Sequence, residues 1–177
     1  MTLKKLNKLI ALTFIGSINC TQTYALDLEV DPIAYGLNGY SLHLGLGQDN
    51  FRFDLGVFGL EVPDSFASNE NFELDFEGYG VKLDYLFGSY QGGFVGIQAA
   101  SSKVGYKLKS SGTKKRLTQV SFGPRVGYRF ILDNNVTITP WIALDFNLDK
   151  EDITIDNEKY EADLVTVFPT VHLGWRF

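Results

Sequence analysis

The stretch VTITPWIALDFNL, residues 136–148, decides the fold of this chain. Its even-numbered positions are all apolar, while threonine, alanine, aspartate, asparagine and one tryptophan occupy the odd-numbered ones. Successive side chains of a β-strand point to opposite faces, so a two-residue period predicts a strand with one apolar and one mostly polar face.

The same alternation runs through most of the chain. Apolar positions alternate with glycine, small or charged residues in residues 40–47, 51–57, 73–87, 118–130 and 167–177. Residues 93–108 alternate less regularly, and a β-bulge is expected near Ser102. No segment carries a 3.6-residue apolar period long enough for a convincing helix.

Turn-forming residues divide the chain into eight segments of strand length. The breaks lie at residues 36–39, 47–50, 63–71, 88–93, 109–115, 133–135 and 149–159. After the first one, short breaks interleave with longer polar ones, which is typical of a membrane barrel with tight turns at one end and loops at the other. The pattern predicts one all-β domain, an eight-stranded antiparallel up-and-down transmembrane barrel.

Alternation alone leaves open which face points outward. A secreted lipocalin-like barrel also alternates, but with its apolar face inside. Here the polar face is rich in glycine and in charges of both signs, which suits a narrow lumen where charges must pair. The charged residues expected there are Arg52, Asp54, Lys82, Asp84, Arg125, Arg129, Asp145 and Arg176.

Aromatic residues on the apolar face also favour a membrane barrel. They gather where the segments meet the short breaks or the C-terminus, at Phe51, Phe53, Tyr85, Phe87, Tyr128, Phe130, Trp175 and Phe177. Such clustering at one level predicts an aromatic girdle at a membrane interface. The mean hydropathy of −0.03 is compatible with this, because a barrel strand is apolar only at every second residue.

The N-terminus predicts export. Three lysines precede a short apolar run, and Ala25 follows Thr23 and Tyr24 as a small residue suited to cleavage. Residues 1–25 are therefore interpreted as a signal peptide and residues 26–177 as the barrel domain. A membrane anchor and lipidation at Cys20 are the less favoured alternatives, since the run is short and Ile18 and Asn19 fit a lipidation motif poorly.

Charge and cysteine content exclude several functions. Removing the signal peptide takes the formal charge from −5 to −8, which argues against nucleic-acid binding. Cys20 is the only cysteine, so no internal disulfide and no cysteine-based zinc site can form.

The C-terminus resembles the signal by which bacterial outer-membrane proteins reach the barrel-assembly machinery. Thr170, Trp175 and Phe177 carry this resemblance, whereas His172 stands where the pattern prefers glycine. With the strand pattern, it makes the chain similar to small barrels of the OmpA/OmpX/OmpW class. The resemblance implies location in the bacterial outer membrane, contact with its lipids and lipopolysaccharide, and no cofactor.

The expected lumen charges have two interpretations. They form either a salt-bridge plug that keeps the barrel rigid or a gate for ions in a narrow, porin-like channel. The plug is favoured, because an eight-stranded lumen is just wide enough for side chains to fill it. We therefore expect a non-enzymatic barrel with a structural or cell-surface interaction role.

Ser41 and His43 support an enzymatic alternative. Small outer-membrane lipid A deacylases and palmitoyltransferases use serine and histidine, and these two residues share one face of a strand. The deacylase order His-x-Ser is reversed here, and an inward pair lacks obvious access to an acyl chain. His172 is the second of only two histidines, too few for a recognisable metal site.

The loops differ in charge. Lys114, Lys115 and Arg116 are candidates for contact with lipopolysaccharide phosphates. Asp149, Glu151 and Asp152 are candidates for contact with divalent ions or an extracellular protein. Solvated loop tips without a ligand are the plainer interpretation of both.

Deletion of Phe177 should impair assembly more than stability. The loss of one interfacial aromatic costs a few kcal/mol at most, which a closed barrel tolerates once it has folded. We expect the deletion variant to refold into detergent in vitro but to accumulate unfolded or be degraded in cells. Normal outer-membrane levels would show that Phe177 is not an assembly signal.

Overall fold

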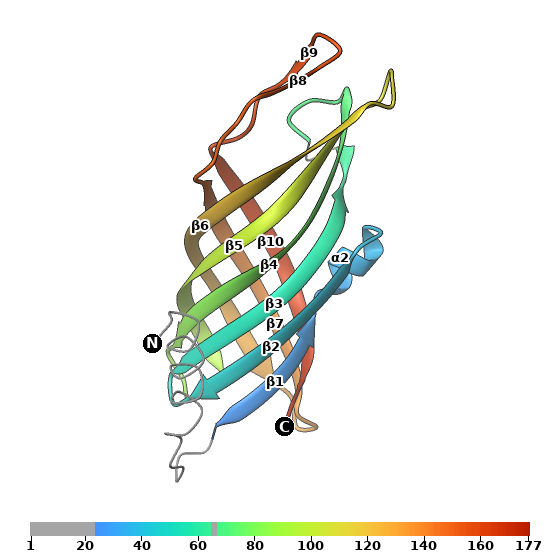
Figure 1. The fold of residues 1–177 in the computed structure, drawn as a ribbon. Helices are drawn as coiled ribbons and strands as arrows, with labels where there is room; N and C mark the ends of the chain where they lie inside the picture. Colours follow the sequence, from blue (N-terminus) through green and yellow to red (C-terminus); the bar gives the residue numbers. More distant parts are fainter. Residues whose placement is uncertain (1–23, 65–66) are drawn as a thin grey trace, which may run out of the picture.

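The computed structural model describes residues 24–64 and 67–177 and forms a closed barrel of eight antiparallel strands (Figure 1). Each barrel strand pairs with the next one along the chain, and the last pairs with the first. The strands are β1 (Ala25–Val30), β2 (Tyr40–Gln48), β3 (Phe51–Val62), β4 (Phe72–Leu86), β5 (Gly92–Leu108), β6 (Lys114–Ile131), β7 (Val136–Asn147) and β10 (Val165–Arg176). The fold predicted from the alternation is confirmed.

The barrel closes between β1 and β10. Asp27 lies opposite Arg176 and Val30 opposite Leu173, and the Phe177 N–H donates to the carbonyl oxygen of Leu26 at 2.8 Å. A closed sheet has no free edge, so its backbone groups can pair without water, as a bilayer interior requires.

The apolar side chains point outward. In β2, Leu42, Leu44 and Leu46 are 42–47% exposed, whereas Ser41 and His43, which point the other way, are buried. The lipocalin-like orientation is therefore wrong for this chain. Among the described residues, no helix is long and apolar enough to cross a membrane.

Aromatic side chains are exposed toward both ends of the apolar band. The eight residues of the expected girdle are all exposed, and Phe51 lies opposite Tyr85 with their rings 5.3 Å apart. A second exposed group, which the sequence analysis missed, lies toward the other end and consists of Tyr35, Tyr40, Tyr79, Phe122 and Phe146. Aromatic residues at both borders of an apolar band are typical of a membrane-spanning barrel.

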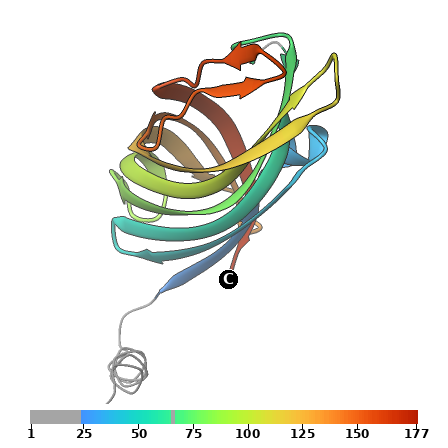
Figure 2. The ribbon, with the colours of Figure 1, turned by 45° about the horizontal axis from the view of Figure 1, so that its top comes forward.

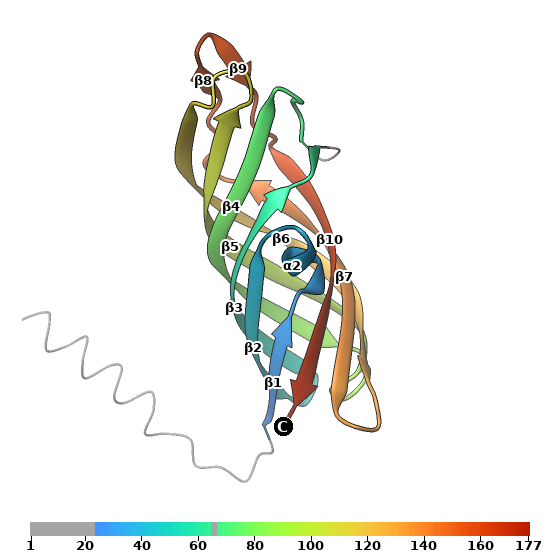
Figure 3. The same ribbon diagram turned by 90° about the vertical axis from the view of Figure 1, so that its right-hand side faces the viewer.

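The two ends of the barrel differ in their connections. The tight turns after β2, β4 and β6 lie at the end that also holds the C-terminus (Figure 3). Asp49 and Asn135 adopt φ of 53° and 64° in two of these turns, a conformation that Asp and Asn tolerate better than most residues. The longer connections project from the opposite end (Figure 2), which we call the external end.

Two elements at the external end were not predicted. The first strand stops at Val30, and Asp31 caps a short helix, α2 (Pro32–Gly36), by accepting a hydrogen bond from the Ile33 N–H at 2.8 Å. The connection before β10 contains a hairpin of β8 (Ile153–Ile155) and β9 (Glu158–Tyr160), turned by Asp156 and Asn157 at φ of 49° and 70°. The start of the helix and the turn of the hairpin each depend on two or three local residues. So few residues produce no repeating pattern of apolar positions in the sequence.

The expected bulge near Ser102 is wrong. Ser102 lies opposite both Gly78 and Gln119 in continuous ladders. The small residues 99–102 make the alternation of apolar and polar residues irregular there, but the strand pairing is regular. The expected signal peptide, with Cys20, lies outside the described residues except for Tyr24 and Ala25, the first residue of β1.

The described ladder between β6 and β7 is interrupted twice, and a proline lies at each place. Its pairs stop after Phe122–Phe146, resume at Arg125–Ala143, stop again after Gly127–Trp141 and resume at Phe130–Ile138. Pro124 and Pro140 occupy the two gaps and have no N–H to donate. At the upper gap the strands approach so closely that a Cβ on Gly123 would lie 1.8 Å from the Leu144 carbonyl oxygen.

Substituting Gly123→Ala should therefore impair folding. The atom that the new methyl group meets belongs to the backbone and cannot rotate away. Heat-modifiable migration on unboiled gels should show a reduced folded fraction. Gly47→Ala is the matched control on the inner face, since its Cβ would lie 3.4 Å from the Tyr90 ring, at ordinary contact distance. Equal folded fractions for the two variants would refute the steric argument.

Candidate functional site in the barrel lumen

Arg52 of β3 lies at the centre of a buried ion cluster in the lower lumen. Its guanidinium donates to Asp27 at 3.2 Å, to Glu29 at 3.0 Å and to Asp54 at 3.1 Å. Asp27 and Glu29 come from β1 and Asp54 from β3 itself. Because Arg has five donors in a planar fork, one side chain can bind carboxylates on two strands.

Arg129 of β6 binds the same β1 carboxylates from the other side. It contacts Asp27 at 2.8 Å and also pairs with Glu29. The Thr137 hydroxyl donates to Glu29 at 3.2 Å. Glu29, only 1% exposed, is thus held by two guanidinium groups and a hydroxyl, so its charge is compensated without solvent.

A layer of histidine and lysine lies next to Arg52. Lys82 contacts Asp54 at 2.7 Å and His43 at 2.8 Å. His43 also lies 3.0 Å from Asp54, and its ring is 4.3 Å from that of His172, which reaches Glu29 at 3.3 Å. These contacts join the Arg52 and Lys82 groups into one network.

Arg125 and Trp141 cover this network. The Arg125 guanidinium lies 4.2 Å from the Trp141 ring centroid and 5.1 Å from that of Phe94, and it contacts Asp84 at 3.5 Å. Trp141 also contacts the His172 ring edge-on at 5.4 Å. The cluster of Asp27, Glu29, Asp54 and Asp84 with Arg52, Lys82, Arg125 and Arg129 therefore contains four acidic and four basic groups, all buried. We call it the lumen plug.

Two of the charged residues expected in the lumen, Asp145 and Arg176, lie apart from the other six. Asp145 lies higher in the lumen, where both its oxygens accept hydrogen bonds from the Gln98 amide at 2.9 Å. Arg176 lies at the opposite end of the barrel, 4.2 Å from the Tyr90 ring. Neither belongs to the lumen plug.

Sequence reasoning missed the β1 contribution. Neither Asp27 nor Glu29 was among the charged residues expected in the lumen. The signal was present, because Asp27, Glu29 and Asp31 alternate with Leu26, Leu28 and Val30.

Ser41 and His43 are not arranged as a nucleophile and its base. The Ser41 hydroxyl accepts a hydrogen bond from the Asp31 N–H at 3.0 Å, and His43 is bound to Asp54 and Lys82. No hydrogen bond joins Ser41 to His43 in the described part of the chain. Within residues 24–64 and 67–177, no group of three or more acidic, His or Cys side chains is placed to hold a metal ion.

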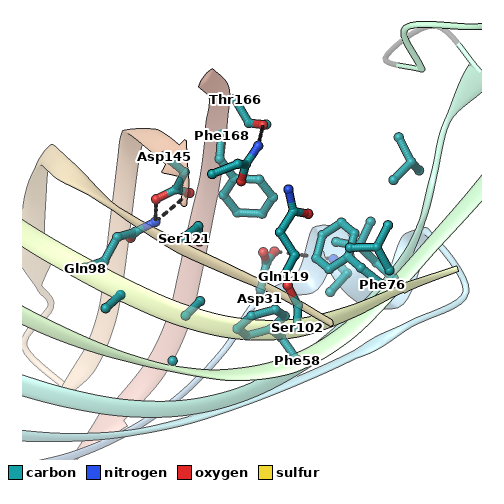
Figure 4. Close-up of a pocket in the computed structure, with 18 of the residues that line it drawn as sticks. Asp31, Phe58, Phe76, Gln98, Ser102, Gln119, Ser121, Asp145, Thr166 and Phe168 are labelled. Atoms are coloured by element: carbon teal, nitrogen blue, oxygen red, sulfur yellow. Dashed lines mark hydrogen bonds between the residues drawn. The ribbon is translucent and has the colours of Figure 1, made fainter. Parts of the chain in front are cut away.

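Above the lumen plug lies a cavity of about 250 Å³ (Figure 4). His43, Lys82, Trp141 and His172 line it on the plug side. Phe58 and Phe76 line one part of the wall with their rings edge-on at 6.0 Å, and Gln98 and Asp145 line another. Tyr160 of β9 and Ala162 and Asp163 of the connection to β10 also border the cavity, so the cavity belongs to the external half of the barrel.

The external end has its own hydrophobic cluster. The hairpin packs Ile153, Ile155 and Tyr160 against the extended ends of β4 and β5, where Phe72, Leu74, Tyr106 and Leu108 are buried. The Thr113 hydroxyl donates to Asp156 at 3.0 Å. Hydrogen bonds from Ser111 and Thr113 lower the pKa of the Asp156 carboxyl, so this link is present at neutral pH and is lost as pH falls through the lowered value.

The charged loop residues are largely paired with one another. Lys114 contacts Asp75, and Arg116 contacts Asp75 at 3.1 Å and Glu77 at 3.0 Å. Lys115 donates to the Thr154 carbonyl oxygen at 2.5 Å. Asp152 lies 3.0 Å from Lys159, and a hydrogen bond from Lys159 lowers the pKa of Asp152. Of the other expected loop acids, Asp149 and Glu151 are exposed.

The expected assembly-signal residues lie on different faces. Trp175 and Phe177 are exposed on the apolar surface, whereas Thr170 is buried and donates to Asp31 at 2.5 Å. Thr170 therefore also links β10 to the capping residue of α2.

Similar solved structures are small outer-membrane barrels. They include Neisserial surface protein A, at 14% identity and a TM-score of 0.49, covering 87% of this chain and 93% of that one. The N-terminal β-barrel domain of Pseudomonas aeruginosa OprF has 12% identity and a TM-score of 0.45, with 87% and 96% covered. Ail, the attachment invasion locus protein of Yersinia pestis, has 15% identity and a TM-score of 0.43, with 87% and 93% covered.

No protein-family model matches the sequence, and no curated protein does either. The likeness to the solved structures is one of fold. The role of the chain therefore has to be inferred from its own residues.

Replacing Glu29→Gln should destabilise the barrel by about 3 kcal/mol, because it leaves Arg52 and Arg129 buried with one carboxylate fewer. Urea-induced unfolding in lipid vesicles measures the effect. Glu73→Gln is the matched control, since Glu73 pairs with Lys107 on the exposed surface at 2.8 Å and its loss should leave the midpoint unchanged. Equal midpoints for wild type and Glu29→Gln would show that the lumen plug does not hold the barrel together.

Proposed function

We propose that the protein is an integral outer-membrane barrel that neither conducts solutes nor catalyses a reaction, and that it presents its external end to partners at the cell surface. The lumen plug is the observation that carries this proposal. Its eight charged groups come from β1, β3, β4 and β6, and the pairs Arg52–Asp27, Arg129–Asp27 and Arg125–Asp84 join strands that are not neighbours in the ring.

The arrangement of the plug supports a mechanical role. Each buried charge has an oppositely charged partner at 4.0 Å or less, so an ion crossing the lumen would have to break several such pairs at once. The enzymatic alternative receives no support from the contacts of Ser41, whose hydroxyl is bound to the backbone of Asp31.

The external end supports an interaction role because it is folded rather than loose. Seven buried hydrophobic residues join the hairpin to β4 and β5 beyond the barrel. A preorganised surface loses less conformational entropy on binding a partner. Its positive and negative side chains are interspersed and paired, so the surface favours a partner of mixed polarity over a uniformly anionic one. Lipopolysaccharide and other outer-membrane lipids would surround the apolar band, and the barrel-assembly machinery would insert it.

Planar-bilayer recording tests the non-conducting barrel. The purified wild-type protein should produce no discrete conductance steps. A variant carrying both Glu29→Ser and Arg52→Ser removes one charge of each sign from the centre of the plug and should produce small steps, which shows that the assay detects an opened lumen. Ion-selective steps from the wild type, of the same size as those of the variant, would refute the proposal.

A further inference from the structure

The cavity above the lumen plug has two chemically different sides. β3 and β7 lie four strands apart in the ring of eight, on opposite sides of the lumen. On the side of β3 and β4 the lining is apolar, with Phe58, Leu60, Val62, Leu74 and Phe76. The lining from β5 to β7 contributes the polar side chains Gln98, Gln119, Ser121, Asp145 and Asn147, beside apolar ones such as Val104 and Trp141. A ligand that fits both sides must be amphipathic.

The polar side presents hydrogen-bond acceptors. The Gln98 amide uses its N–H groups on Asp145, and its Oε1 is buried without a partner. Asp145 is half-buried, and in the described residues no Lys or Arg lies within ion-pair distance of it. A carboxylate and an amide oxygen side by side favour a ligand with N–H donors and a positive charge.

The cations on the plug side of the cavity are each paired with a carboxylate, Lys82 with Asp54 at 2.7 Å and Arg125 with Asp84 at 3.5 Å. Among the described residues that line the cavity, Lys82 is the only basic side chain apart from the histidines. Asp31 and Asp163 add two more carboxylates to the lining. The aromatic rings of the apolar side are also compatible with a cation, because a ring face attracts positive charge.

We propose that this cavity binds a small apolar primary amine in its ammonium form, with the ammonium at Asp145 and Gln98 and the apolar body against Phe58 and Phe76. A volume of about 250 Å³ holds on the order of eight non-hydrogen atoms at the volume per molecule of liquid water. Short alkyl or arylalkyl amines are of this size. The proposal goes beyond a surface-interaction role and does not depend on it.

The fluorescence of Trp141 reports on ligand binding, because its buried side chain lines the cavity. In the described residues its Nε1 has no hydrogen-bond partner. Trp141 and Trp175 are the only tryptophans, and Trp175 faces outward. Trp175→Phe therefore leaves Trp141 as the single fluorophore. This protein, reconstituted in nanodiscs of uncharged lipid, is titrated separately with hexylamine as its hydrochloride, with hexanol and with sodium hexanoate, and the Trp141 emission is recorded.

Hexylammonium should change the emission saturably and at lower concentration than hexanol or hexanoate. Asp145→Asn should weaken this response about tenfold or more, because it removes a hydrogen bond between two charged groups. Asp49→Asn, in a turn at the far end of the barrel, removes the same charge and should leave the response unchanged. Because the amine partitions into the lipid equally in both samples, comparing the two variants also removes that effect from the measured response.

A second variant keeps the test decisive should Asp145→Asn fold poorly. Ser121→Leu leaves every charge in place but fills part of the cavity, so it should also abolish the saturable response. Equal responses to hexylammonium and hexanol, or a response to hexylammonium that survives Ser121→Leu, would overturn the proposal. Conductance of the wild type would refute the non-conducting role while leaving this binding result as it stands.

Discussion

Backbone pairing across the closure between β1 and β10 is the constraint on which the rest of the structure depends. In lipid no water is present to satisfy a free strand edge, so the first and last strands must meet. Closure with eight strands then sets the width of the lumen, and the two-residue period sends every second side chain into it. The outer surface becomes apolar and the inner surface polar as a direct consequence.

A narrow polar lumen leaves few ways to accommodate charge. The chain places carboxylates on β1, β3 and β4 and cations on β3, β4 and β6 so that each finds an oppositely charged partner inside the lumen. This fills the half of the barrel that holds the start of β1 and the C-terminus. Toward the external end the inward residues of β3 and β4 become apolar, and the cavity occupies the space where no ion pairs form.

Strand number, strand positions and the outward apolar face were predictable because they depend on a period that most segments repeat. The helix after Asp31 and the hairpin around Asp156 were not, since each depends on a few residues at a turn. Partners within the lumen were also unpredictable, because they depend on how far each tilted strand is shifted along its neighbour. In the ladders, Asp54 lies opposite Lys82 and Lys82 lies opposite Gln98. Asp145 contacts Gln98 and not the charged groups of the lumen plug.

The two tryptophans allow the most direct test of the central claim, that the apolar face of every strand is turned to lipid and the polar face encloses the plug. The Trp141→Phe variant keeps Trp175 alone, and the Trp175→Phe variant keeps Trp141 alone. Each variant is reconstituted in vesicles of brominated lipid, which quenches the fluorescence of side chains that contact acyl chains. Trp175 should be strongly quenched and Trp141, which lies against Arg125 and His172, should not be. Strong quenching of Trp141 with none of Trp175 would contradict the orientation and with it the lumen plug.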